Sequence, residues 1–160
     1  SDESGLLVVL ARGHVDVPVL PRVLGTGVIV VRYAPTADDP GLLRARCRMS
    51  SLDLQGYTRS VDANHAIVAH IPADLAARLT GLDWVKASEG EWALASAALR
   101  VSPAEALQRF AWRGLLVTSG ERGGVLYTDA GAMPWLAAPA EVIALETGAG
   151  DVFITSFLAA

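Results

Sequence analysis

The chain has 160 residues, of which 52% are apolar and 19% are charged, and its formal net charge is −4. This composition excludes a disordered chain, and the length fits one domain with a packed core but is short for two. The basic residues are scattered along an acidic chain, so we expect no nucleic-acid partner.

The cysteine content and the hydropathy of the chain indicate its cellular compartment. Cys47 is the single cysteine, so no internal disulfide can form, which fits a reducing compartment. The apolar runs are far shorter than the roughly 20 residues that cross a bilayer, and the first residues do not have the pattern of a leader. We therefore expect a cytoplasmic protein with no membrane partner.

The first half of the chain predicts a few short elements separated by turns. Residues 1–17 begin with polar capping residues and become apolar before Gly13, which predicts a short helix. The β-branched residues that follow a Gly-Thr-Gly turn predict a strand within residues 25–34. A second short strand is expected at residues 50–56.

From residue 72 onward, predicted helices and strands alternate. The helices are expected at residues 72–81, 89–100 and 102–112, the last with a Ser102–Glu105 capping box. The strands are expected at residues 82–88, 114–120, 123–128, 132–138 and 141–146, with a hairpin turn at 129–131. This alternation predicts an α/β fold in which helices cover both faces of a mostly parallel sheet.

The segment TGAGD, residues 147–151, carries the strongest chemical signal. Gly148 and Gly150 allow successive backbone N–H groups to point at one spot, and the start of the following helix adds further unpaired N–H groups. Such a site binds anions, and Asp151 beside it adds a base. Transfer of a phosphoryl group to an alcohol needs both. The alternative is a simple turn in which Asp151 only begins a helix.

In this context the segment TGAGDVF resembles the second signature of the ribokinase-like, phosphofructokinase-B type carbohydrate kinases. Four other segments resemble landmarks of that family in the same order: residues 26–33, 52–59, 84–92 and 115–127. The resemblance implies a ribokinase-like three-layer α/β/α fold with a mostly parallel central sheet. It also implies that residues 1–160 form a single, partial kinase domain, with the remnant of a small β lid at residues 22–34.

The resemblance assigns roles to individual residues. Asp151 would be the catalytic base, and the backbone amides of Gly148, Ala149 and Gly150 would form the anion hole. Glu91 would hold magnesium through water, although it also fits an ordinary acidic helix start. The residues implied near the nucleotide are Thr118, Ser119, Gly120, Gly123, Lys86, Ser88 and Thr147. Asp53 and Arg59 would lie close to the transferred group.

The implied activity is an ATP- and Mg2+-dependent kinase that phosphorylates a hydroxyl of a sugar, cyclitol or nucleoside. Leu145 stands where the family has an aspartate that helps to bind a monovalent cation, so activation by potassium is not expected. Two alternatives stay open: a catalytically silent nucleotide-binding or regulatory module of the same fold, and a kinase of a vitamin precursor such as pyridoxal or hydroxymethylpyrimidine. A homodimer also stays open.

Overall fold

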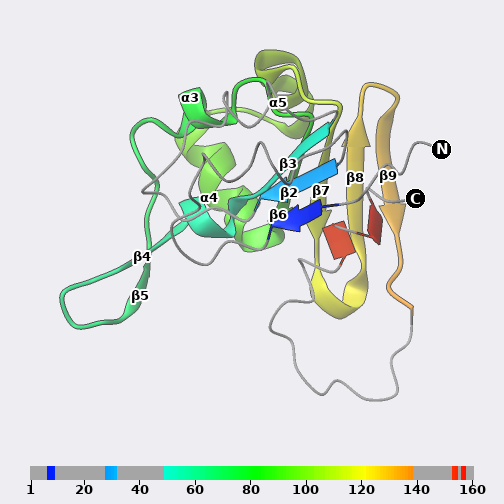
Figure 1. Ribbon diagram of the computed structural model, residues 1–160. Helices are drawn as coiled ribbons and strands as arrows, with labels where there is room; N and C mark the ends of the chain where they lie inside the picture. The colour runs from blue at the N-terminus through cyan, green and yellow to red at the C-terminus, as the bar shows by residue number, and fades with distance from the viewer. Residues whose placement is uncertain (1–6, 10–27, 32–48, 139–152, 155, 158–160) are drawn as a thin grey trace.

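A twisted sheet of seven strands forms the centre of the molecule (Figure 1). The computed structural model describes residues 7–9, 28–31, 49–138, 153–154 and 156–157. The strand order is β1-β2-β3-β6-β7-β8-β9. The first five are parallel: β1 (Leu7–Val9), β2 (Val28–Val31), β3 (Met49–Asp53), β6 (Trp84–Ser88) and β7 (Gly114–Thr118). The last two, β8 (Gly124–Thr128) and β9 (Gly131–Trp135), are antiparallel additions. The predicted mostly parallel α/β sheet is confirmed.

Between residues 49 and 138, the structure has three α-helices and two 3-10 helices: α3 (Leu75–Leu79), α4 (Glu89–Leu99), α5 (Pro103–Phe110), η2 (Leu54–Tyr57) and η3 (Gly120–Arg122). Ser88 and Ser102 begin α4 and α5 with complete capping boxes, as predicted for the second of them. The backbone N–H and the hydroxyl of Ser102 hold the pKa of Glu105 below its usual range. None of the helices in the described part of the chain has the length and apolarity that a membrane span requires.

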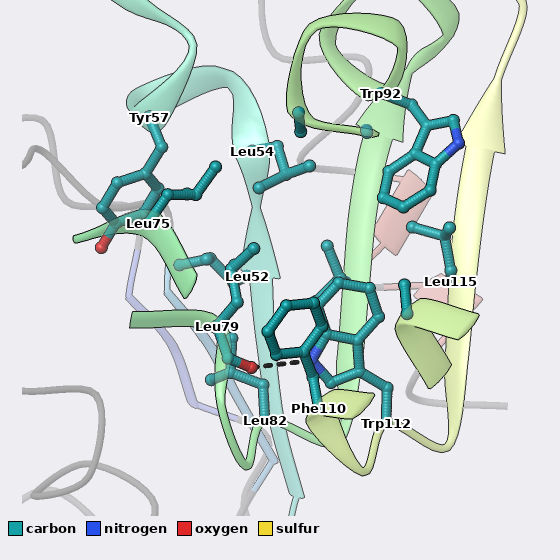
Figure 2. Packing of buried hydrophobic residues seen from close by; sticks show 14 of the residues in the cluster. Leu52, Leu54, Tyr57, Leu75, Leu79, Leu82, Trp92, Phe110, Trp112 and Leu115 are labelled. Atoms are coloured by element: carbon teal, nitrogen blue, oxygen red, sulfur yellow. Dashed lines mark hydrogen bonds between the residues drawn. The ribbon is translucent and has the colours of Figure 1, made fainter. Parts of the chain in front are cut away.

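Successive side chains along β6 and β7 point to opposite faces of the sheet, and both faces carry buried residues. Val85 and Leu115 point into a core that is completed by α3, α4, α5 and η2 (Figure 2). Leu116 points the other way and packs with Ile154 near the C-terminus. The partly buried residues of this second cluster are Trp84, Leu126, Trp135, Phe153 and Phe157. The sheet therefore has cover on both faces, as the alternation of helices and strands predicts.

A buried hydrogen bond fixes the end of α3 against the chain that follows α5. The indole N–H of Trp112 donates to the carbonyl oxygen of Leu79 at 2.7 Å, and the indole stacks on Phe110 (Figure 2). Replacing Trp112 with phenylalanine leaves this carbonyl without its donor, so we expect a loss of about 1–3 kcal/mol in the free energy of unfolding. Urea unfolding measures it. Trp92→Phe is the control, because it removes no hydrogen bond within the described part of the chain; equal losses in the two variants would contradict the assignment.

The N-terminal predictions need correction. The helix expected within residues 1–17 is wrong, because Leu7–Val9 form strand β1 and pair in parallel with β2. A short run of leucine and valine fits a strand of a parallel sheet as well as a helix, and here it pairs with β2 at the outer side of the described sheet. The strand expected within residues 25–34 is confirmed at Val28–Val31, but its expected place in a small lid at residues 22–34 is wrong. It lies between β1 and β3 in the large sheet.

The small second sheet is formed instead by β4 (Arg59–Val61) and β5 (Ile67–Ala69), an antiparallel hairpin that projects from the body of the molecule (Figure 1). The strand expected at residues 50–56 ends at Asp53, since the carboxylate of Asp53 accepts the N–H of Gln55 and turns the chain into η2. The helix expected at residues 72–81 is shorter than predicted.

The other predictions after residue 82 hold where the structure describes them. The strands expected at residues 82–88, 114–120, 123–128 and 132–138 are confirmed as β6, β7, β8 and β9. The helices expected at residues 89–100 and 102–112 are confirmed as α4 and α5. The strand expected at residues 141–146 lies outside the described residues.

Candidate active site

The carboxyl ends of β3, β6 and β7 meet at one edge of the sheet. Asp53 is paired in register with Lys86, and Ser88 with Thr118. Four of the residues predicted near the nucleotide or the transferred group therefore lie at the same edge. Ligands of open α/β sheets bind at this edge, in the crevice between the loops that follow the carboxyl ends of the strands.

A buried ion pair joins two of these strand ends. The ammonium of Lys86 lies 2.7 Å from a carboxylate oxygen of Asp53, and the two side chains are 8% and 2% exposed. The other carboxylate oxygen of Asp53 accepts the N–H of Gln55. A lysine ammonium has three N–H donors, and within the described part of the chain only the one directed at Asp53 has a partner. The pair therefore places a cation with spare donors at the carboxyl edge.

Glu91 lies in the first turn of α4, which begins directly after β6, and is buried. One carboxylate oxygen accepts the backbone N–H of Ser88 at 2.8 Å, and the other lies 3.2 Å from the guanidinium of Arg59. The Arg59 side chain is 47% exposed. Glu91 thus caps the start of α4, as an acidic residue there commonly does. The structure also brings it together with Arg59, which was expected near the transferred phosphoryl group.

Glu91 is compatible with magnesium held through water but not with an all-protein cage. Among the described residues, no group of three histidine, cysteine, aspartate or glutamate side chains could hold a metal ion. Magnesium keeps several of its waters and takes one or two carboxylates together with substrate phosphates. The single buried carboxylate of Glu91, at the start of α4, fits that requirement.

The loop after β7 turns tightly beside the start of α4. Gly120 and Gly123 have φ angles of 58° and 94°, which other residues adopt only with strain. A Cβ atom on Gly123 would lie 2.0 Å from the backbone oxygen of Trp135, so this position also requires glycine for space. Arg122 forms an ion pair with Glu89 in the first turn of α4. This exposed pair lies between the loop that was predicted to line the nucleotide and the first turn of the helix that carries Glu91.

Two buried polar atoms on the Lys86 side of the sheet were not anticipated. The hydroxyl of Ser51 and the indole N–H of Trp84 are buried and have no hydrogen-bond partner among the residues that the structure describes. The two residues are register partners in β3 and β6. Alternation places them on the same face as Asp53 and Lys86. Little in the sequence indicates these atoms, because Ser51 is one of two adjacent serines in a strand that also ends in aspartate. Buried polar atoms of this kind are rare and often mark bound water or a functional site.

The remaining predicted residues, Thr147, Gly148, Ala149, Gly150 and Asp151, lie outside the described residues, as does Leu145. The base and the anion hole therefore stay predictions. The described residues that follow them pack on the face of the sheet that carries Lys86. Phe157 meets Trp84 edge to face with ring centroids 5.2 Å apart, and Ile154 packs on Leu116.

Comparison with protein-family models decides the family. The model described as pfkB family carbohydrate kinase matches residues 59–160, which include the β4–β5 hairpin, β6, α4 and β7. The chain belongs to the pfkB family of carbohydrate kinases. The match covers Arg59, Lys86 and Glu91, together with the TGAGD segment. None of the curated proteins compared with the chain matches it significantly.

Solved structures confirm the ribokinase-like fold of this pfkB chain. A pyrophosphate-dependent kinase in the ribokinase family, complexed with a pyrophosphate analog and myo-inositol, is 18% identical with a TM-score of 0.73; the match covers 94% of this chain and 55% of that one. Burkholderia thailandensis nucleoside kinase is 19% identical with a TM-score of 0.62, over 82% of this chain and 41% of that one. Ribokinase from Thermotoga maritima is 17% identical with a TM-score of 0.55, over 90% and 45%. The chain spans about half the length of these structures.

Proposed function

We propose that this protein transfers the γ-phosphoryl group of ATP to a hydroxyl of a sugar, cyclitol or nucleoside. The observation that carries the proposal is the Asp53–Lys86 pair at the carboxyl edge of a pfkB-family sheet. Burying a lysine is costly unless the charge is paired, and here the pair leaves two ammonium donors without a partner among the described residues. Phosphate oxygens are the acceptors that such donors bind well.

Each group of the site has a distinct task in this proposal. Lys86 binds the phosphates of the donor, and Asp53 holds Lys86 in place. The amides of Gly148, Ala149 and Gly150 stabilise charge that builds up on the migrating phosphoryl group, while Asp151 takes the proton of the attacking hydroxyl. The packing of Phe153 and Ile154 on the Lys86 side of the sheet supports this arrangement.

The nucleotide and its cation would occupy the edge between α4 and the loop after β7. Thr118, Ser119, Gly120 and Gly123 line the nucleotide together with Ser88 and Thr147. Glu91 binds the water shell of Mg2+, which offsets the charge of the donor phosphates when it is bound. The Arg122–Glu89 pair supports the proposal, because it brings the loop and the helix start together. Leucine offers no side-chain oxygen, so the proposal includes no monovalent cation bound through Leu145.

An assay of product formation tests the proposal in the full-length protein. The protein is incubated with MgATP, or in a separate arm with magnesium pyrophosphate, and a panel of sugars, inositols and nucleosides. Pyridoxal and a hydroxymethylpyrimidine are added as separate acceptors, and phosphorylated products are identified by mass spectrometry. We expect product and an equal amount of ADP from at least one sugar, cyclitol or nucleoside. Product from the vitamin precursors alone would show that the acceptor is a vitamin precursor and not a sugar, cyclitol or nucleoside. Product with pyrophosphate but not with ATP would show that ATP is not the phosphoryl donor. ATP binding without any product would favour the silent module.

A further inference from the structure

The β4–β5 hairpin is joined to the active-site edge through a short, buried helix. Leu54 and Tyr57 of η2 are 0% and 1% exposed, whereas Ile67 in the hairpin is 70% exposed. An ion pair lies at each end of η2. The Asp53–Lys86 pair precedes it, and the Arg59–Glu91 pair follows it, so both ends are tied to β6 and the start of α4.

Arg59 is the residue through which the hairpin meets α4. It is the first residue of β4, and its guanidinium lies 3.2 Å from the Glu91 carboxylate. A backbone hydrogen bond from His70 to the Thr58 carbonyl closes the base of the hairpin at 3.0 Å. Because this bond fixes only the base, the Arg59 side chain can set the direction in which the hairpin leaves the body.

We propose that Arg59 is a positioning residue that couples occupancy of the phosphate-donor site to the orientation of the β4–β5 hairpin. This inference rests on the proposed function, because it takes the α4 edge as the place where the donor and its divalent cation bind. With the site empty, Arg59 pairs with Glu91. With the donor present, Arg59 binds phosphate oxygens instead, and the orientation of the β4–β5 hairpin changes as the side chain moves.

Charge balance gives the exchange its direction. Glu91 is 6% exposed, so leaving its carboxylate without a cationic partner would be costly. A polyphosphate that arrives with a divalent cation supplies a partner for both halves of the pair, since Glu91 meets the hydrated cation and Arg59 meets the phosphates. The Arg59 side chain is half-exposed, so its guanidinium can reach an anion that binds from the solvent side. A planar guanidinium also binds phosphate through two hydrogen bonds.

Hydrogen exchange of hairpin peptides, read by mass spectrometry, tests the coupling in the full-length protein. We expect MgATP to change the exchange rate of residues 59–69 by about fivefold or more, the lower end of ordinary coupling between sites. In Arg59→Gln the change should disappear at a MgATP concentration that saturates the site, although calorimetry should show weaker binding because one phosphate contact is lost. Arg59→Lys should retain part of the change. ATP in excess EDTA should leave hairpin exchange unchanged in every variant.

Arg113→Gln is the matched control. Arg113 forms an ion pair of 3.1 Å with Asp83, but at the amino ends of β6 and β7, so its loss should leave the response of the hairpin intact. If Arg59→Gln responds to MgATP as the unmodified protein does, the coupling is wrong and the proposed kinase stands. If the unmodified protein binds neither MgATP nor magnesium pyrophosphate, the proposed function falls and the coupling falls with it. Should Arg59→Gln fail to fold, a full response in Arg59→Lys would still overturn the role of the guanidinium.

Discussion

Replacing Asp151 with asparagine is expected to leave ATP binding intact and to lower turnover by about a thousandfold or more. The loss lies within the range seen when a positioned base is removed, roughly 100- to 10,000-fold. Asparagine has nearly the same shape as aspartate but cannot accept the proton of the attacking hydroxyl. Binding should persist because the proposed phosphate contacts come from backbone amides and from Lys86, which this substitution leaves in place. The decisive pair of measurements is kcat with the best acceptor and the dissociation constant of ATP by calorimetry.

Asp129→Asn is the matched control for this substitution. Asp129 is exposed in the turn between β8 and β9, so the same chemical change there should leave turnover unaltered. Turnover near that of the unmodified protein in Asp151→Asn would remove Asp151 from the role of base. A matching loss of ATP affinity would instead make it a binding residue.

Lys86→Met is expected to lower the free energy of unfolding by about 3–5 kcal/mol, since it leaves the buried carboxylate of Asp53 without its cation. The double variant Asp53→Asn with Lys86→Met should recover most of this loss. It removes both charges, and asparagine can still accept the N–H of Gln55. Urea unfolding at neutral pH measures the free energies of the two variants.

The same double variant separates the structural role of the pair from its proposed chemical role. If Lys86 binds the donor phosphates, turnover should stay low in the double variant even though stability returns. The affinity for ATP should fall as well. Recovery of both stability and turnover would show that the pair only ties β3 to β6.

The part of the fold that the sequence predicts well is the part in which local signals agree. The capping box of Ser102 and Glu105 marks the start of α5, with Pro103 in its first position, and the run of apolar residues in β7 is bounded by glycine and serine. The N-terminal strand β1 was missed because a short apolar run after polar residues fits a helix start as well as a buried strand. Its partner β2 comes from a distant part of the sequence, so local patterns could not decide between them.

The candidate site shows a similar division. Motifs placed Asp53, Lys86, Ser88 and Glu91 near the same ligand, and the structure brings them to one edge. Their pairing could not be predicted, because Asp53 and Lys86 are 33 residues apart and meet only through the register of β3 and β6. The Arg59–Glu91 contact depends in the same way on how η2 directs the chain, which no local pattern encodes.

A crystal structure of the full-length protein with Mg2+ and a non-hydrolysable ATP analogue tests the central claim most directly. We predict that oxygens of the terminal phosphate lie about 3 Å from the amides of Gly148, Ala149 and Gly150 and from the ammonium of Lys86, with the Asp151 carboxylate open to the acceptor site. A terminal phosphate bound elsewhere, or an Asp151 side chain directed away from it, would contradict the account.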